Sequence, residues 1–115
     1  MPELRQDPTL SDLQDYIKNV ALERGWDKNN YLEIFLLFSE EVGELAKAIR
    51  NKTGLYAENN TQAKKAEVEN EMADVLNYLL DLANYFEINL EEAFRKKDQI
   101  NSKRSWRNSK PEKPK

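Results

Sequence analysis

The chain has 115 residues, the length of a single domain, and 34% of them are charged. It contains no histidine and no cysteine. This composition excludes disulfide scaffolds, zinc fingers, thiol chemistry, haem or iron–sulfur ligation through these side chains, and any Ser-His-Asp triad. Chemistry in this protein must therefore use carboxylates, amines, hydroxyls and aromatic rings.

The formal net charge of −3 is unevenly distributed along the chain. Of the 18 Lys and Arg residues, six lie within residues 103–115, where Glu112 is the only acid; residues 1–102 hold the other 12, together with 20 of the 21 acidic residues. An acidic body repels a phosphate backbone, so we expect no nucleic-acid partner. Residues 107–115, rich in Ser, Lys and Pro, are expected to form a disordered basic tail after a domain of residues 1–106.

The longest apolar run covers only residues 34–38, which is far too short to cross a bilayer. The first residues lack the basic stretch followed by an apolar one that a secretory signal requires. We therefore expect a cytoplasmic protein without a membrane partner.

Apolar residues at helical spacing predict a first helix that begins at about Leu10. Thr9 or Ser11 is placed to cap its N-terminus, and Gly25 ends it. Residues 25–30 are then expected to form a loop.

The second predicted helix runs from about residue 31 to residue 51, with Asn29 or Asn30 as its cap. A polar break follows at residues 55–61. The third predicted helix is strongly periodic and extends from about residue 61 to residue 86.

Asn89 is expected to start a fourth helix, because Glu92 three residues later completes a pair that resembles a capping box. This helix fades near Lys103. The predicted fold is therefore all-α, a bundle of four main helices. Wide apolar faces on the second and third helices exceed what one short bundle can bury, so we expect a homodimer or homotetramer.

Acidic residues cluster on the second and third predicted helices, at residues 40–44 and residues 71–74. Residues three or four apart share one face of a helix, so each cluster can present a pair of carboxylates. If the two helices pack antiparallel, the pairs converge, and a divalent cation relieves the repulsion between them. The four carboxylates belong to Glu41, Glu44, Glu71 and Asp74. Oxygen ligands favour Mg²⁺ or Mn²⁺, or Ca²⁺, over zinc or copper.

Glu41 is the most informative of these residues, because it falls within the apolar stripe of its helix, where leucine would be expected. A carboxylate in apolar surroundings is unfavourable unless it is neutralised, paired or bound to a cation. Glutamate is nevertheless common on helix surfaces, and Glu40, Glu67 and Glu69, taken singly, are expected to be solvated.

The two acidic clusters, separated by 26 residues, resemble the EExxE…ExxD signature of the MazG-like, all-α nucleoside triphosphate pyrophosphohydrolases. The likeness covers roughly residues 10–106. It includes residues 24–27, 43–50, 74–80 and 88–93, and the closing Lys97, Asn101 and Arg104.

The resemblance implies hydrolysis of an NTP or dNTP between its α and β phosphates, giving the monophosphate and pyrophosphate. The Mg²⁺ ligands, with Mn²⁺ as an alternative metal, would be Glu41, Glu44, Glu71 and Asp74. Glu40 would orient or deprotonate the attacking water. The biological role implied is the cleaning of nucleotide pools.

The resemblance also implies contacts with the substrate. Trp26 corresponds to an aromatic residue that lines the base pocket in the dCTP-pyrophosphatase-like branch, although it could instead pin the first helix to the second. Tyr78 could donate its hydroxyl to the sugar or a phosphate, or pack between helices. The other candidate substrate contacts are Lys97, Asn101 and Arg104, with Trp106 covering the base or a subunit surface.

One departure and several alternatives accompany this hypothesis. The dCTP-specific branch carries a second pocket tryptophan where this chain has Asn51 and Lys52, so a preference for cytosine is not carried over. The alternatives are a non-catalytic helical interaction module and an all-α dUTPase-type diphosphatase with the same metal site. A di-iron bundle is excluded, because its Glu-x-x-His pairs require histidine.

Overall fold

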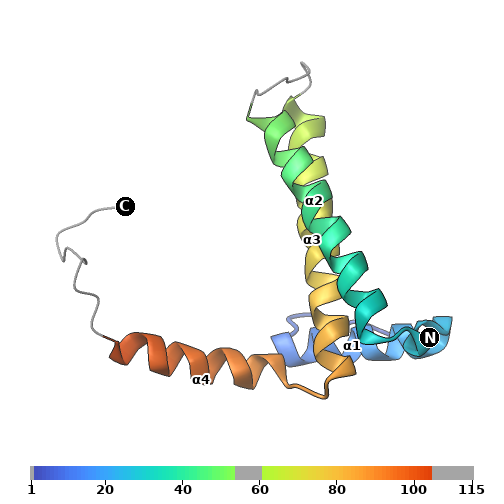
Figure 1. Ribbon diagram of the computed structural model, residues 1–115, viewed down its shortest axis with the longest axis vertical. Coiled ribbons are helices and arrows are strands. Elements are labelled where there is room, and N and C mark those ends of the chain that lie inside the picture. The colour runs from blue at the N-terminus through green and yellow to red at the C-terminus, as the bar shows by residue number, and fades with distance from the viewer. Residues whose placement is uncertain (1, 54–60, 105–115) are drawn as a thin grey trace.

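The computed structural model describes residues 2–53 and 61–104, and all secondary-structure elements assigned within these ranges are helices (Figure 1). In chain order the elements are α1 (Leu10–Arg24), the 3₁₀ turn η1 (Trp26–Lys28), α2 (Tyr31–Lys52), α3 (Thr61–Tyr85) and α4 (Leu90–Lys103). The predicted all-α fold and order of helices are confirmed. The predicted tail at residues 107–115, Trp106 and most of the predicted break at residues 55–61 lie outside the described residues.

The ends of α1 follow from hydrogen bonds within a few residues of sequence. Thr9 Oγ1 accepts a hydrogen bond from the Asp12 N–H at 3.0 Å, and the Asp12 carboxylate accepts one from the Thr9 N–H at 2.9 Å. Gly25 ends the helix in the left-handed region, with φ of 76°. Of the two expected caps, Thr9 is therefore the cap, and Ser11 lies inside the helix.

The same local chemistry starts α2 and α4. Asn30, and not Asn29, caps α2: its side chain accepts a hydrogen bond from the Glu33 N–H, and the Glu33 carboxylate accepts one from the Asn30 N–H, both at 2.9 Å. Asn89 caps α4 by accepting a hydrogen bond from the Glu92 N–H at 3.0 Å. These caps satisfy N–H groups that a helix terminus leaves without partners.

The helices α2 and α3 form an antiparallel pair, α1 crosses one end of this pair, and α4 extends away from it (Figure 1). Among the described helices, α4 packs chiefly on α1. The core is small, and most of it lies where α1, α2 and α3 meet. Its buried apolar residues are Val20, Ala21, Ile34, Ala48, Leu80 and Ala83.

A polar network joins α1 to the turn between α3 and α4. The buried Gln14 side chain donates hydrogen bonds to Asn84 Oδ1 at 3.0 Å and to the Ile88 carbonyl at 2.6 Å. Its carbonyl oxygen accepts one from the Leu90 N–H at 3.0 Å, and Asn84 donates to the Gln14 backbone carbonyl at 3.1 Å. The network holds α1 against α3 and so positions one wall of the pocket described below.

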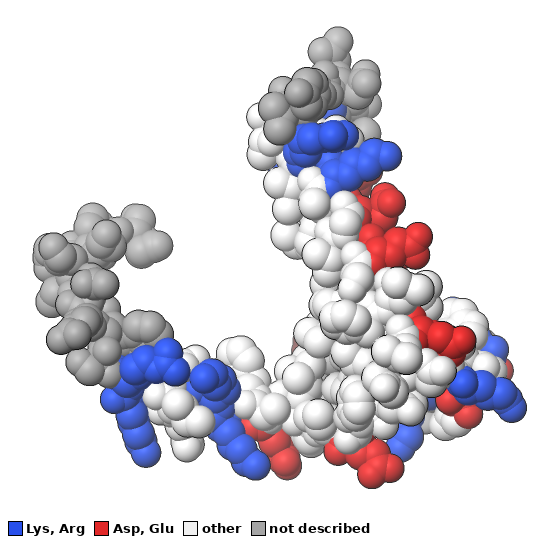
Figure 2. Space-filling model, in the orientation of Figure 1, with Lys and Arg blue, Asp and Glu red and all other residues white. Residues whose placement is uncertain are grey.

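Large apolar side chains remain exposed on α2 and α4. Leu32 is 63% exposed and Leu36 is 70% exposed, and on α4 Phe94 is 68% exposed. Figure 2 shows a broad uncharged surface on the α2–α3 pair, bordered by acidic side chains on one side and basic ones at the far end. No described helix is both long and apolar enough to cross a membrane.

Candidate active site

Three carboxylates converge where α2 packs against α3. Glu41 comes from α2, and Glu71 and Asp74 come from α3, one turn apart on the same face. One carboxylate oxygen from each of the three lies within 4.8 Å of the others, and all three residues are half-buried. The antiparallel packing of the two helices therefore creates a dense negative site.

The environment of this site has its largest effect on the pKa of Glu41. Burial is the main cause that raises the pKa of its carboxyl from the ordinary 4.5 to about 7. A hydrogen bond shared with Glu71 and the negative charges of Asp74, Glu71 and Glu40 raise it further. The arrangement therefore favours a proton or a cation between the carboxylates.

Glu71 provides a test of whether these residues fit a metal ion. Its Oε1 atom is buried, and no hydrogen-bond donor among the described residues reaches it. A buried acceptor without a partner is unfavourable, and such atoms in native structures usually contact water or an ion. Carboxylate oxygens are the ligands that Mg²⁺ and Mn²⁺ prefer. The site therefore fits a hard divalent cation.

Two predicted site residues on α2 stand outside this cluster. Glu44 lies one turn beyond Glu41 and is exposed, and its carboxylate is not among those within 4.8 Å. Glu40 is also exposed, but its charge contributes to the raised pKa of Glu41 and of Tyr78, which places it within electrostatic range. Four carboxylates were predicted to converge, and the structure brings three of them together.

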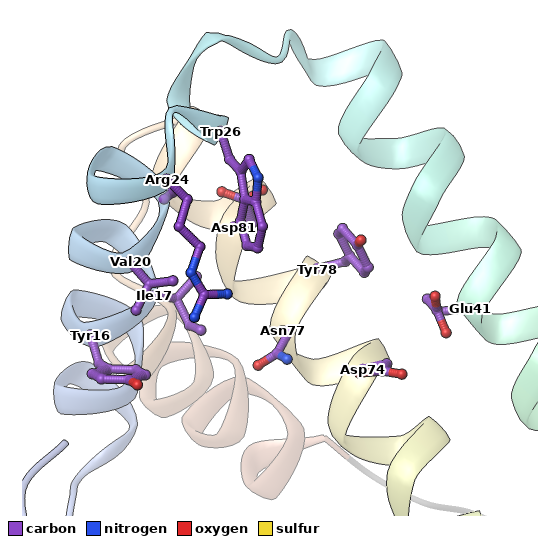
Figure 3. Close-up of a pocket in the computed structure, with 11 residues that line it drawn as sticks. Tyr16, Ile17, Val20, Arg24, Trp26, Glu41, Asp74, Asn77, Tyr78 and Asp81 are labelled. Carbon is purple, nitrogen blue, oxygen red and sulfur yellow. The ribbon is translucent and has the colours of Figure 1, made fainter. Parts of the chain in front are cut away.

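A cavity of about 480 Å³ opens beside the cluster, between α1, α2 and α3 (Figure 3). Glu41 and Asp74 lie at one end, and Trp26 and Asp81 lie toward the other. The remaining residues that line it are Tyr16, Ile17, Val20, Ala21, Arg24, Asn77 and Tyr78. The pocket thus combines an acidic end with an aromatic end.

The predicted pocket residue Trp26 is half exposed at the rim, in the short turn η1. The guanidinium carbon of Arg24 lies 4.9 Å from the centre of the indole ring, a cation–π contact. Both side chains line the cavity. A planar ligand that enters the pocket can therefore stack on an aromatic surface.

Tyr78 lies on α3 between the two ends of the pocket (Figure 3). Burial is the first cause that raises the pKa of its hydroxyl, followed by the negative charges of Glu41, Asp74, Asp81 and Glu40. The phenol therefore stays protonated at neutral pH and presents a hydrogen-bond donor to the cavity.

The predicted substrate contacts on α4 do not line this pocket within one chain. Lys97 and Asn101 belong to α4, which points away from the α2–α3 pair, and Arg104 follows its last residue (Figure 1). In the described part of a single chain, these three residues are therefore not brought together with the acidic cluster.

Sequence reasoning did not single out Arg24, Asn77 or Asp81 as site residues, although all three line the cavity. A signal for Asp81 was present: it follows Asp74 by two helical turns and so lies on the same face. Arg24 is the last residue of α1, and its place in the pocket depends on its contact with Trp26 in η1, which short-range sequence patterns do not reveal.

Comparisons with known proteins identify the family of this chain. The chain matches the MazG nucleotide pyrophosphohydrolase domain over residues 30–109. It is 34% identical over 90 residues to the protein YpjD of Bacillus subtilis (strain 168), a match that covers 76% of this chain and 78% of YpjD. It is 33% identical over 103 residues to dCTP pyrophosphatase 1 of Rattus norvegicus and of Homo sapiens, covering 85% of this chain and 59% of theirs. This chain thus belongs to the MazG nucleotide pyrophosphohydrolase family.

Proposed function

We propose that the protein is a metal-dependent nucleoside triphosphate pyrophosphohydrolase. It splits an NTP or dNTP between the α and β phosphates and releases a nucleoside monophosphate and pyrophosphate. The observation that carries this proposal is the convergence of Glu41, Glu71 and Asp74 at one end of a pocket whose other end holds Trp26. Membership of the family and the name of the rat and human relatives support the same reaction class.

In this proposal, Glu41, Glu71 and Asp74 hold Mg²⁺ or Mn²⁺, and Glu44 joins them from the next turn of α2. The buried Oε1 atom of Glu71, which lacks a donor among the described residues, supports a cation at this position. A divalent cation supplies charge neutralisation for the triphosphate and lowers the pKa of a bound water.

The chain's own residues have separate roles around the triphosphate. Glu40 orients the attacking water and accepts its proton as the bond from the α-phosphorus to the bridging oxygen breaks. The Tyr78 hydroxyl donates a hydrogen bond to the sugar or a phosphate. Trp26 stacks on the base, and stacking on a flat ring accepts any base.

A second copy of the chain completes the site. The acidic cluster itself offers no positive charge to the leaving pyrophosphate, and Arg24, the one cation among the described residues that line the pocket, contacts the Trp26 ring. The cations Lys97 and Arg104, with Asn101, do not line the pocket of their own chain. The exposed apolar side chains of α2 and α4 support a homodimer or homotetramer, in which Lys97, Asn101 and Arg104 reach a neighbour's pocket.

We place this enzyme in the cytoplasm, where it removes unwanted nucleotides.

The test is hydrolysis of a panel of NTPs and dNTPs with Mg²⁺ or Mn²⁺, followed by quantification of monophosphate and pyrophosphate. We expect equal amounts of the two products, and a loss of at least about a hundredfold in kcat/KM for Glu41→Gln. Glu23→Gln, an exposed glutamate on α1, is the matched control and should retain activity.

No turnover of any nucleotide by the folded oligomer would overturn the proposal and favour a non-catalytic interaction module. Hydrolysis confined to dUTP would instead favour the dUTPase-type alternative.

A further inference from the structure

One carboxylate in the pocket, that of Asp81, has no role in the proposed reaction. It projects from α3 at the aromatic end, away from Glu41 and Asp74 (Figure 3). Asp81 is half-buried and borders both the 480 Å³ pocket and an adjoining cavity of about 130 Å³, and Trp26 borders the same two cavities. Asp81 and Trp26 therefore share one end of the pocket.

The described residues provide Asp81 with neither a hydrogen bond nor an ion pair. Burial alone raises the pKa of its carboxyl, with no nearby donor or cation to lower it. A partly desolvated carboxylate without donors is unfavourable in the free protein. A ligand that brings N–H donors to this end of the pocket would relieve that penalty.

The spacing along α3 matches the length of a nucleotide. Asp74, Tyr78 and Asp81 lie on one face of the helix at intervals of about one turn. The seven residues from Asp74 to Asp81 span about 10 Å along the axis. This length is comparable to the reach from the α-phosphate of a nucleotide to the far edge of its base. When the phosphates lie at the acidic cluster, the base therefore arrives at Trp26 and Asp81.

We propose that Asp81 is a specificity-determining residue. Its carboxylate accepts a hydrogen bond from an exocyclic amino group of the base, a role that rests on the proposed function. Guanine presents an amino group beside a ring N–H, and cytosine and adenine each present an amino group. Uracil and thymine have carbonyl oxygens on both sides of their ring N–H, and a carboxylate, which can only accept, repels them. The pocket therefore selects bases that carry an amino group.

Two matched substrate pairs test this role, because the members of each pair share the sugar and the triphosphate. dCTP differs from dUTP at the position of the 4-amino group, and dGTP differs from dITP by the 2-amino group. The kcat/KM of each is measured for the full chain with Mg²⁺ and for Asp81→Asn and Asp81→Ala. Asp15→Asn, an exposed aspartate on α1 outside this pocket, is the control.

We expect the wild type to prefer the amino-bearing member of at least one pair by roughly ten- to a hundredfold. Asp81→Ala should abolish this preference. Asp81→Asn should abolish or reverse it, because an amide can also donate to a carbonyl oxygen of the base. The control should keep the wild-type ratio. Both Asp81 variants should melt at or above the wild-type temperature, since an unpartnered carboxylate is removed.

Binding of dCMP, dUMP, dGMP and dIMP, measured by calorimetry, separates this inference from the proposed function. If no triphosphate is hydrolysed but wild type binds the amino-bearing monophosphate more tightly and Asp81→Asn does not, the enzyme proposal fails and the role of Asp81 stands. If triphosphates are hydrolysed with equal ratios in wild type and Asp81→Asn, the role of Asp81 is wrong. If both Asp81 variants fail to fold, Asp81 is structural, and the inference is overturned as well.

Discussion

The protonation of a single side chain, that of Glu41, makes the stability of the protein depend on pH. Its pKa is raised from 4.5 to about 7 in the folded protein, so the metal-free folded state binds this proton more tightly than the unfolded chain does. The stability of the metal-free protein should therefore fall as pH rises from about 4.5 to about 7, because the unfolded state loses the proton first.

A cation that replaces this proton should counteract the fall of stability with rising pH. We expect the increase in melting temperature caused by Mg²⁺ to grow between about pH 5 and pH 8, as measured by thermal denaturation with Mg²⁺ and with EDTA. Glu41→Gln cannot ionise at this position and should remove most of the pH dependence. An increase that is the same at every pH would contradict the coupling.

Glu87 is a second residue whose local geometry leads to a measurable expectation. It lies in the turn just after α3 with a positive φ of 56°, and the next N–H, that of Ile88, donates to the Ala83 carbonyl at 2.9 Å. Side chains destabilise this left-handed conformation, and glycine does not. Glu87→Gly should therefore raise the free energy of unfolding by about 0.5–1 kcal/mol in denaturant titrations. Glu87→Ala removes the carboxylate but keeps the Cβ atom, and it should give no such gain.

Among the helices, the contact between α1 and the α3–α4 turn depends on Gln14. Gln14→Leu keeps the approximate size of the side chain but leaves the Leu90 N–H, the Ile88 carbonyl and Asn84 Oδ1 without the partner that the Gln14 side chain provides. We expect a loss of about 2–3 kcal/mol in the free energy of unfolding, since buried groups would lose their hydrogen bonds. Asn19→Leu, at an exposed position of α1, should change stability by much less. Equal effects of the two substitutions would show that the network contributes little.

The ends of the helices are features that the sequence predicts well. The caps at Thr9, Asn30 and Asn89 each bond to an N–H three residues along the chain, so a short segment is enough to propose the candidates. The choice of Thr9 over Ser11, and of Asn30 over Asn29, came from the structure. The rotation of α2 about its own axis depends on all its contacts with α3. For that reason the convergence of Glu41 with α3 could be predicted, but the separation of the exposed Glu44 could not.

For the whole molecule, the exposed apolar surface leads to a prediction about assembly. Leu32 and Leu36 on α2 are largely exposed, while the buried apolar core of the described chain is small. We expect the wild type to sediment as a dimer or tetramer, and Leu36→Glu to shift it toward monomer with loss of activity. Asn19→Glu, which adds the same charge at an exposed position of α1, should leave the assembly intact.

Two results of sedimentation would contradict this expectation. A monomeric wild type would show that the exposed apolar face does not bind a second copy. A monomeric Leu36→Glu variant with full activity would show that Lys97 and Arg104 of a neighbour are not needed at the pocket.

The sequence by itself determined the all-α class, the order and approximate ends of the helices and the kinds of chemistry open to the chain. These properties depend on composition and on hydrogen bonds between residues a few positions apart. Only the tertiary structure decided that Glu71 holds a buried oxygen without a donor, that Arg24 and Asp81 line the pocket, and that α4 points away from it. These features arise where side chains distant in sequence exclude water together, and packing between helices sets that geometry.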